Sequence, residues 1–304
     1  MTPARPYCGR FAPSPTGALH FGSLVSAMAS WCDARAHGGT WKVRLEDVDV
    51  PRSVAGADAA ILSALERHGF QWDGPVVRQS ERTALYAAAL DTLHGRGLLF
   101  PCACTRSELE GAPPGAGGER IYQGTCRGGV AAGRSARALR MRVGDAIIAF
   151  ADRAQGAQRQ QLSTEVGDFV VRRADGLFAY QLAVVVDDAE QGVTDVVRGA
   201  DLLASTPRQI MLQMHLQLPT PSYLHHPVAV DAHGDKLSKS TGAAALPDET
   251  LQPLLAAWSF LTQRPAPSPP GSVGEFWQWA HGAWDASLMP ARSSCAVTPA
   301  RHTL

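Results

Sequence analysis

The first clear hydrophobic pattern follows a loop near the N-terminus. Apolar residues recur there at helical spacing, and Gly38 and Gly39 come directly after them. This pattern predicts an amphipathic helix over about residues 19–37. The apolar positions that define it are Leu19, Leu24, Met28 and Trp31. Alternating apolar and polar residues over 41–46 then predict a strand.

Two more helices are expected before residue 100. The first carries Ile61, Leu62 and Leu65, with Ser53 as its cap, and closes at Gly69. The second runs from about residue 81 to 95 or 97. The order of loop, helix, strand, helix, helix and strand favours an α/β fold, a Rossmann-like doubly wound parallel sheet with helices on its faces.

The pattern breaks at Pro101, where the chain becomes rich in Gly, Pro, Cys and Arg as far as about residue 143. We interpret this segment as an inserted module. Residues 169–173 and 177–186, joined by a turn at Asp175 and Gly176, then predict a hairpin. Its second arm is so apolar that we expect a strand buried in a sheet.

The last third of the chain repeats the α/β signals. Strands are expected over 193–198 and 227–230, and helices over 247–261 and 276–284. Between the strands, Ser205 and Pro207 predict a helix start, with Ser205 as the cap. Its expected apolar face is Ile210, Leu212, Met214 and Leu216.

These signals divide the chain into four parts. Residues 1–100 and 169–245 are the two halves of the Rossmann-like layer, and 101–168 are the inserted subdomain. Residues 246–304 are a short helical C-terminal region.

Composition narrows the class of protein. The 304 residues are 45% hydrophobic and 18% charged, which is typical of a soluble globular protein. No apolar run is long enough to cross a bilayer, and no secretory signal is visible, so we expect a cytoplasmic protein. The net charge is zero, so any surface that binds nucleic acid must be local.

The stretch RFAPSPTGALHFGS at residues 10–23 suits a phosphate-binding loop. It is a turn that leads into a helix start, where unpaired backbone N–H groups and the positive end of the helix dipole attract anions. His20 and Gly22 stand in that first turn, and Gly22 has no side chain to keep a ligand from the backbone. An ordinary turn and helix cap is the alternative.

A second candidate is KLSKS at residues 236–240, which holds two of only three Lys in the chain. Taken alone, it could be a solvated charged loop. Together with HFGS at residues 20–23, it resembles the signature pair of class I aminoacyl-tRNA synthetases. The resemblance implies that His20, Gly22, Lys236 and Lys239 bind ATP with its Mg²⁺, and that His20 and Lys239 are catalytic. Ser23 and Leu237 depart from the usual signatures.

Further stretches narrow the resemblance to the glutamyl-tRNA synthetase branch: RLED at 44–47, LFAYQLAVVVDD at 177–188 and VRGADL at 197–202. The resemblance implies a pocket for L-glutamate. An Arg fork suits the substrate's carboxylate, and Glu46 suits its amino group. The implied pocket residues are Arg10, Phe11, Ala12, Pro13, Ser14, Glu46, Tyr180 and Arg198.

Three of the six cysteines lie close together in the inserted module. Cys102, Cys104 and Cys126 could supply three thiolates to a structural Zn²⁺, although buried or incidental cysteines are the alternative. The resemblance implies Tyr122 as the fourth ligand, with one zinc per chain. A small, loop-rich module has little hydrophobic core and needs such a crosslink to be stable.

About 64 residues follow Ser240, too few for the large helical domain with which glutamyl-tRNA synthetases read the anticodon. The chain therefore resembles the truncated paralogues, the glutamyl-Q tRNA(Asp) synthetases. That resemblance implies activation of glutamate by ATP without tRNA, followed by transfer to queuosine in the anticodon of tRNA(Asp). We expect a monomer without membrane contact. Candidate phosphate contacts are Arg106, Arg127, Arg134, Arg137, Arg172 and Arg173.

Three other functions stay open. The chain could be a discrete glutamyl-tRNA synthetase whose anticodon domain is a separate chain. It could be a non-catalytic paralogue that binds tRNA or an amino acid, although the intact signatures argue against this. Another adenylyl transferase with the same nucleotide loops is disfavoured by the match to the glutamate pocket.

Overall fold

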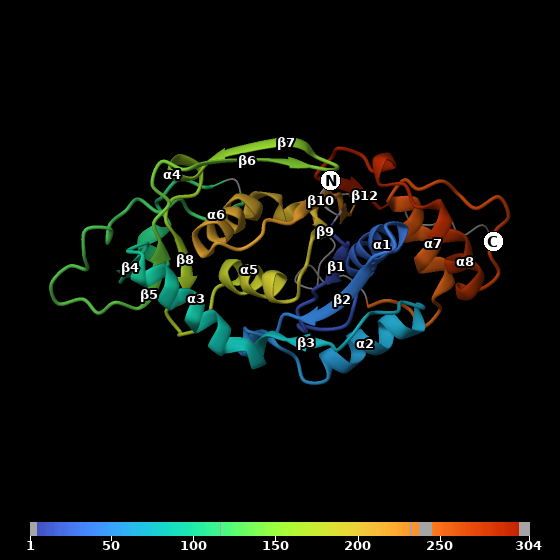
Figure 1. Ribbon diagram of the computed structural model, residues 1–304, viewed down its shortest axis with the longest axis horizontal. Coiled ribbons are helices and arrows are strands. Elements are labelled where there is room, and N and C mark those ends of the chain that lie inside the picture. Colours follow the sequence, from blue (N-terminus) through green and yellow to red (C-terminus); the bar gives the residue numbers. More distant parts are fainter. Residues whose placement is uncertain (1–4, 116, 232, 237–244, 298–304) are drawn as a thin grey trace.

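The computed structural model describes residues 5–115, 117–231, 233–236 and 245–297. The molecule is elongated: a parallel sheet with its helices lies toward one end, and a smaller antiparallel sheet lies toward the other (Figure 1). Among the helices of the described residues, none is long and apolar enough to span a bilayer.

The parallel sheet is built from two groups of strands. β1 (Cys8–Phe11), β2 (Thr40–Leu45) and β3 (Val77–Arg78) pair in that order. β9 (Asp195–Gly199) pairs in parallel with β10 (Ser222–His226). The N–H of Thr194 donates to the carbonyl of Cys8 at 2.9 Å, which places β9 beside β1. The spatial order is therefore β3-β2-β1-β9-β10, and it reverses between β1 and β9.

Helices cover both faces of this sheet. α1 (Phe21–Ala36) and α2 (Ala57–Arg67) belong to one core, and α3 (Thr83–Gly95), α5 (Tyr180–Glu190) and α6 (Thr206–Leu216) belong to the other. Neighbouring strand residues alternate between the cores: Val197 packs into the first and Val196 into the second. The predicted doubly wound α/β fold is confirmed.

The insertion forms antiparallel sheet between β4 (Leu99–Cys102) and β8 (Phe169–Arg172). β5 (Ala138–Met141) pairs with both of these strands. β6 (Ile147–Asp152) and β7 (Gly156–Gln161) form a long hairpin along one side of the molecule, followed by α4 (Leu162–Glu165) (Figure 1). Tyr223 of β10 pairs with Asp152, so this hairpin joins the insertion to the parallel sheet.

The C-terminal helices α7 (Leu251–Phe260) and α8 (Val273–Ala283) pack on α1. The ring of Trp277 lies 4.4 Å from that of Trp31, and its indole N–H donates to the carbonyl of His68 at 2.7 Å. The Trp-rich helix α8 therefore packs on the first half of the α/β layer. β11 (Val228–Val230) pairs with β12 (Ser294–Ala296). Short 3₁₀ segments occur at Val50–Arg52, Gln79–Arg82, Ser107–Leu109, Ala200–Ser205 and Ala286–Leu288.

The predicted second arm of the hairpin is wrong. The chain does turn back for one bridge, between Arg172 and Phe178, but Tyr180–Glu190 is helix α5. This helix is buried without interruption from Leu182 to Asp188, because α3 and α6 pack against it. A helix that is buried all round has no amphipathic period, so an apolar run of this length does not distinguish it from a buried strand.

The predicted helix starts also need correction. α2 begins after Gly56, whose φ is 77°, and not at Ser53. Ser205 precedes α6, but its backbone is helical and its side chain does not cap the helix. Instead, its hydroxyl accepts from Gln181 at 3.1 Å. On α6, Met214 is 62% exposed, so it does not belong to the apolar face.

Candidate active site and metal centre

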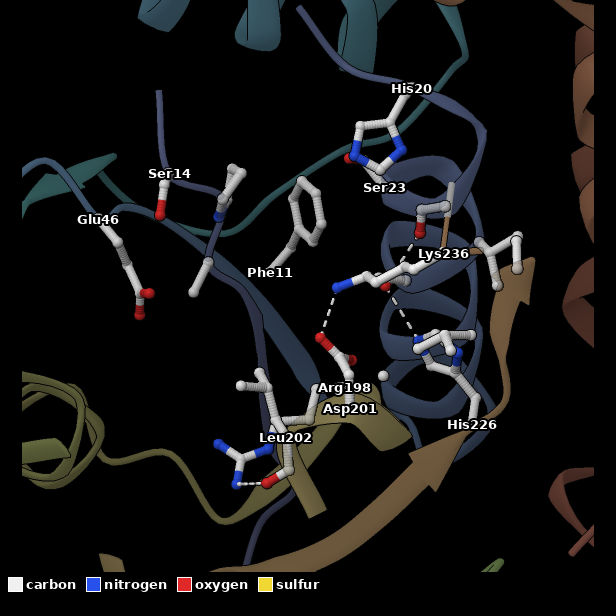
Figure 2. Close-up of a pocket in the computed structure, with 18 of the residues that line it drawn as sticks. Phe11, Ser14, His20, Ser23, Glu46, Arg198, Asp201, Leu202, His226 and Lys236 are labelled. Atoms are coloured by element: carbon white, nitrogen blue, oxygen red, sulfur yellow. Dashed lines mark hydrogen bonds and ion pairs between the residues drawn. The ribbon is translucent and has the colours of Figure 1, made fainter. Parts of the chain in front are cut away.

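A cavity of about 770 Å³ lies where the carboxyl ends of β1, β2, β9 and β10 meet. In an open α/β sheet, the reversal of strand order leaves a crevice at this edge, where ligands bind. Figure 2 shows Glu46 and Ser14 toward one side of the cavity, and His20, Lys236 and His226 toward the other. The predicted site residues that line the cavity are Arg10, Phe11, Ala12, Pro13, Ser14, His20, Gly22, Glu46, Tyr180, Arg198 and Lys236.

The side of the cavity near Glu46, the Glu46 end, rests on a buried charge network. Oδ1 of Asp188 accepts from Nε of Arg10 at 3.2 Å and from Nη1 of Arg44 at 2.8 Å. Nη2 of Arg44 donates to Oε1 of Glu46 at 3.3 Å. The Arg44 side chain has 0% exposure and also forms an ion pair with Asp187. Two strands and α5 are thereby fixed to one another by paired charges.

The pKa values of two carboxyls in this network, Glu46 and Asp188, shift in opposite directions. Burial raises the pKa of Glu46, although Arg44 and Arg10 oppose that shift. Burial acts the same way on Asp188, but there the charges of Arg10 and Arg44 outweigh it and lower the pKa. Burial also raises the pKa of Tyr180, so its hydroxyl keeps its proton and can donate to a ligand.

Arg198 is held by a chain of hydrogen bonds that begins in the insertion. Its Nε donates to Nε2 of His225 at 3.0 Å, so that nitrogen of His225 carries no proton. The other ring nitrogen, Nδ1, therefore donates to Asp152 of β6, at 2.5 Å. Burial and Arg198 lower the pKa of His225 to about 4 even though Asp152 opposes the shift. Arg198 also donates to Thr206 at 2.9 Å and to the Tyr180 hydroxyl at 3.5 Å.

The other side of the cavity, the His20 end, is formed by the start of α1. His20 directly precedes this helix, and Gly22 lies in its first turn, which contains no acidic residue. The N–H groups of Ser23 and Leu24 donate to the carbonyl of His20 at 2.9 and 3.0 Å, so the positive end of the helix dipole is what this turn offers an anion. Across the cavity mouth, Nε2 of His226 lies 3.0 Å from the Ser26 hydroxyl, which connects β10 to α1 (Figure 2).

Lys236 reaches the cavity from the loop after β11. Its ammonium lies 2.5 Å from a carboxylate oxygen of Asp201, which follows β9 (Figure 2). The side chains of Lys236 and Asp201 are 46% and 33% exposed. Lys239, the other predicted lysine, lies outside the described residues, as do the remaining residues of the loop up to 244.

The structure brings the predicted metal ligands together. The three sulfur atoms of Cys102, Cys104 and Cys126 lie within 4.8 Å of one another. The Tyr122 hydroxyl is 3.6 Å from Sγ of Cys102 and 3.8 Å from Sγ of Cys104. Ligand atoms about 2.0–2.3 Å from a tetrahedral zinc lie at about these separations from one another, so the four residues fit such an ion.

Neighbouring groups favour negative charge on Cys102 and Cys126, whereas burial raises the pKa of Cys104 and of Tyr122. Nε of Arg140 donates to Sγ of Cys102 at 3.2 Å, and the guanidinium lies 3.9 Å from the centre of the Tyr122 ring. Burial opposes ionisation of Cys126, but the backbone of Ala103 and the hydroxyl of Tyr122 lower the pKa of its thiol to about 7. The cluster is therefore suited to binding a cation.

The arginines predicted to contact phosphate fall into two groups. Arg127, Arg134 and Arg173 already pair with carboxylates of Asp168, Glu108 and Asp49. The other three are exposed: Arg106, Arg137 and Arg172.

Sequence reasoning missed several residues that complete the cavity. Asp188 and Asp201 lie inside the motifs at 177–188 and 197–202, but they contribute through contacts made across the fold. The strand that carries His225 and His226 was not predicted. A polar pair at the carboxyl end of a buried strand is the signal that could have found them.

Comparison with known proteins agrees with this geometry. The family model described as "tRNA synthetases class I (E and Q), catalytic domain" matches residues 8–253. A glutamyl-Q tRNA(Asp) synthetase of Aromatoleum aromaticum is 56% identical over 291 residues, which are 94% of this chain and 91% of that protein. One of Dechloromonas aromatica is 55% identical over 299 residues, or 97% and 99% of the two chains.

Among solved structures, a glutamate-tRNA synthetase of Elizabethkingia anophelis has a TM-score of 0.79 and 24% identity. The match covers 97% of this chain and 68% of that one. This likeness shows the fold, and the curated relatives show the family. The chain belongs to the glutamyl-Q tRNA(Asp) synthetase family of class I tRNA synthetases.

Proposed function

We propose that this protein activates L-glutamate with ATP, without tRNA, and then transfers it to queuosine in the anticodon of tRNA(Asp). The proposal rests on one observation: a cluster of Arg and carboxylate side chains lies in the same cavity as a helix N-terminus and a lysine. Such a cavity can hold an amino acid and a nucleotide side by side. The relatives described above are glutamyl-Q tRNA(Asp) synthetases by name, which agrees with a glutamyl group and tRNA(Asp) as reactants.

In this proposal, the Glu46 end of the cavity binds glutamate, and we call it the amino-acid end. The guanidinium groups of Arg10 and Arg198 bind carboxylate, because a planar fork of donors matches two carboxylate oxygens. Glu46 accepts from the α-amino group, and the Tyr180 hydroxyl donates to the substrate. The loop Phe11, Ala12, Pro13 and Ser14 forms the adjoining wall.

The His20 end of the cavity binds ATP with its Mg²⁺, and we call it the nucleotide end. An oxygen of the glutamate α-carboxylate attacks the α-phosphorus, so a carboxyl–phosphate bond forms while the bond to the β-phosphate oxygen breaks. The products are glutamyl-adenylate and pyrophosphate. His20 and the N–H groups around Gly22 hold phosphate oxygens, while Lys236 and Lys239 neutralise charge on the leaving pyrophosphate. Lys236 must then leave Asp201 to reach the phosphates.

The second step transfers the glutamyl group. A hydroxyl oxygen of queuosine attacks the activated carbonyl carbon, the bond to the phosphate oxygen breaks, and AMP leaves with the electron pair. The proton of the hydroxyl passes to water in this step. Because the acceptor is an anticodon nucleoside, the anticodon loop itself must approach the cavity.

Zinc has a structural part in this proposal. Cys102, Cys104, Tyr122 and Cys126 would hold one Zn²⁺, which crosslinks the loops of the insertion. In this proposal the chain has four parts, residues 1–100, 101–168, 169–245 and 246–304, and the zinc ligands lie in the second.

The test is exchange of labelled pyrophosphate into ATP with glutamate present and tRNA absent. Exchange is expected, and its absence would refute the proposed activation step and favour a non-catalytic paralogue. Replacing Lys239 by Ala should abolish exchange, because it removes a positive charge that neutralises the leaving pyrophosphate in this proposal.

A second measurement identifies the acceptor. Glutamate transfer is compared on tRNA(Asp) with queuosine, tRNA(Asp) without it, and tRNA(Glu). The proposal requires labelling of the first alone. Labelling of tRNA(Glu) at its 3′ end would instead identify a discrete glutamyl-tRNA synthetase.

A further inference from the structure

The insertion meets the parallel sheet at the tip of the β6–β7 hairpin, which lies against β10 (Figure 1). Asp152 is the last residue of β6, and only 4% of it is exposed. The next residue, Arg153, donates from its backbone N–H to the carbonyl of Tyr223 at 2.9 Å. The function proposed above gives the insertion only the zinc site. The contacts of Asp152 point to a second task, at the amino-acid end of the cavity.

The two carboxylate oxygens of Asp152 have different partners. Oδ1 accepts from three backbone N–H groups, those of Ala154 at 3.0 Å, Gln155 at 2.8 Å and His225 at 3.2 Å. Oδ2 accepts from Nδ1 of the His225 ring at 2.5 Å. The backbone donors hold the carboxylate in place, so Oδ2 stays directed at the imidazole.

This contact decides where the His225 ring carries its proton. Burial lowers the pKa of the ring to about 4, so it is neutral near pH 7 and has a single N–H. With that N–H donated to Asp152, Nε2 presents a lone pair to Nε of Arg198 at 3.0 Å. A guanidinium has donors only, so the opposite tautomer would set two N–H groups against each other.

The same bond orients the guanidinium of Arg198. Its Nη2 donates to Thr206 at 2.9 Å and to the carbonyl of Leu202 at 3.4 Å (Figure 2). Because the group is planar, fixing Nε and Nη2 also fixes Nη1. Nη1 then lies 3.5 Å from the hydroxyl of Tyr180, which lines the same cavity. A carboxylate in the cavity can take the second N–H of Nη1.

We infer that Asp152 is a positioning residue for the amino-acid substrate: it fixes the tautomer of His225, and His225 fixes Arg198 in the orientation that binds a carboxylate. This role rests on the proposed function, because that function makes Arg198 a ligand of glutamate. It also goes further, since the insertion then takes part in amino-acid binding through its hairpin tip.

Asp152→Asn tests this role with a nearly isosteric change. The three backbone N–H groups require the amide oxygen at the Oδ1 position, so the amide NH₂ faces the ring of His225. Nδ1 must then accept, the ring proton moves to Nε2, and Arg198 loses its acceptor. We expect the dissociation constant for glutamate to rise about tenfold or more, because a hydrogen bond to a charged group is lost. The KM for ATP in pyrophosphate exchange should stay near wild type.

The ¹⁵N chemical shifts of the His225 ring report the tautomer directly, and the spectrum of His225→Gln identifies its signals. Nδ1 should carry the proton in the wild type and Nε2 in Asp152→Asn. A role of Asp152 in folding alone predicts no such exchange. A wild-type ring protonated on Nε2 would overturn the inference.

His225→Gln also allows a double-mutant cycle. The amide oxygen of Gln can accept from Arg198 without help from Asp152. Asp152→Asn should therefore weaken glutamate binding about tenfold or more in the wild-type background and little in the His225→Gln background. Equal losses in both backgrounds would refute the role through His225.

Gln155→Ala is the matched control at the same hairpin tip. The Gln155 side chain donates to the carbonyls of His225 at 2.8 Å and Arg292 at 3.1 Å, so it holds the tip to β10 without contacting the imidazole. Glutamate affinity should stay near wild type. A loss equal to that of Asp152→Asn would mean that docking of the tip matters and the tautomer does not.

Glutamate binding, measured by calorimetry without ATP, separates this inference from the proposed function. If the wild type binds glutamate but shows no pyrophosphate exchange, the proposed activation fails, and the binding and NMR results still decide the role of Asp152. If Asp152→Asn changes the tautomer but binds glutamate like the wild type, the inference is refuted and the proposed function stands. A wild-type protein that binds no glutamate refutes both.

Discussion

The two ends of the active-site cavity are built in opposite ways. At the amino-acid end, Arg44 and Asp188 have side chains with 0% and 8% exposure, and they lie on a strand and a helix of the core. At the nucleotide end, the pair of Lys236 and Asp201 is 46% and 33% exposed and lies on connecting segments. One end is part of the folded core, and the other is attached to its surface.

This difference teaches how each end can be changed. Removing one partner of a buried ion pair leaves an uncompensated charge in the core, so function and stability fall together. An exposed pair contributes little to stability, so its residues can be replaced with an effect on chemistry alone. The predictions below test this contrast, from the largest expected effect to the smallest.

Arg44→Met should have the largest effect. It leaves Asp187 and Asp188 buried without this cation, and we expect a loss of about 3–5 kcal/mol in the free energy of unfolding. Glu46 also loses its donor at 3.3 Å, so exchange activity should fall as well. Urea denaturation measures the first effect.

Arg78→Met is the control for that substitution. Arg78 pairs with Asp58 at 2.8 Å, and the two side chains are 35% and 31% exposed. We expect a loss below about 1 kcal/mol. Equal losses in the two variants would contradict the contrast between buried and exposed pairs.

Lys236→Ala should separate activity from stability. Loss of one charge that stabilises the leaving group is expected to lower the rate of pyrophosphate exchange by about 10²–10³-fold. The midpoint of urea unfolding should stay close to wild type, because the pair with Asp201 is solvent-exposed. A large shift of that midpoint would show that this loop supports the core.

The shifted pKa of His225 predicts how the stability of the protein depends on pH. Its pKa is about 4 in the folded protein and 6.5 as an unperturbed value. Between these values the unfolded chain binds more protons, so stability should fall as the pH drops from 6.5 to 4, by roughly 3 kcal/mol. Urea unfolding across this range measures the slope.

His225→Gln is the matched variant, because an amide oxygen can still accept from Arg198 but does not titrate. Its stability should vary less between pH 6.5 and 4 than that of wild type. An unchanged slope would mean that other groups cause the acid sensitivity.

Loss of zinc should have the smallest effect on activation. Cys102, Tyr122 and Cys126 pack in a small core of their own, separate from the two cores that border the active site. Cys126→Ser should lower bound zinc from about one ion per chain, measured by elemental analysis, and loosen the insertion locally. Exchange without tRNA should stay near wild type. A loss of exchange as large as that of Lys236→Ala would contradict this separation.

Local patterns predicted much of this molecule. The helices at 21–36 and 83–95 and the strands at 40–45 and 195–199 follow from periodicity, since each is amphipathic or ends at a Gly. The motifs also located eleven residues that now line one cavity. Helix α5 was mistaken for a strand, because its buried run contains three consecutive valines, which are typical of strands, and so short an apolar run does not distinguish a buried helix from a buried strand.

The sequence by itself determined the chemistry available: which residues carry charge, where helices begin, and which thiols are close along the chain. Only the tertiary structure decided which charges neutralise one another. Arg44 meets Asp188 across 144 positions, and Asp152 of the insertion orients His225, which holds Arg198. Burial raises the pKa of Glu46 and lowers that of His225, and burial exists only once distant segments have packed together.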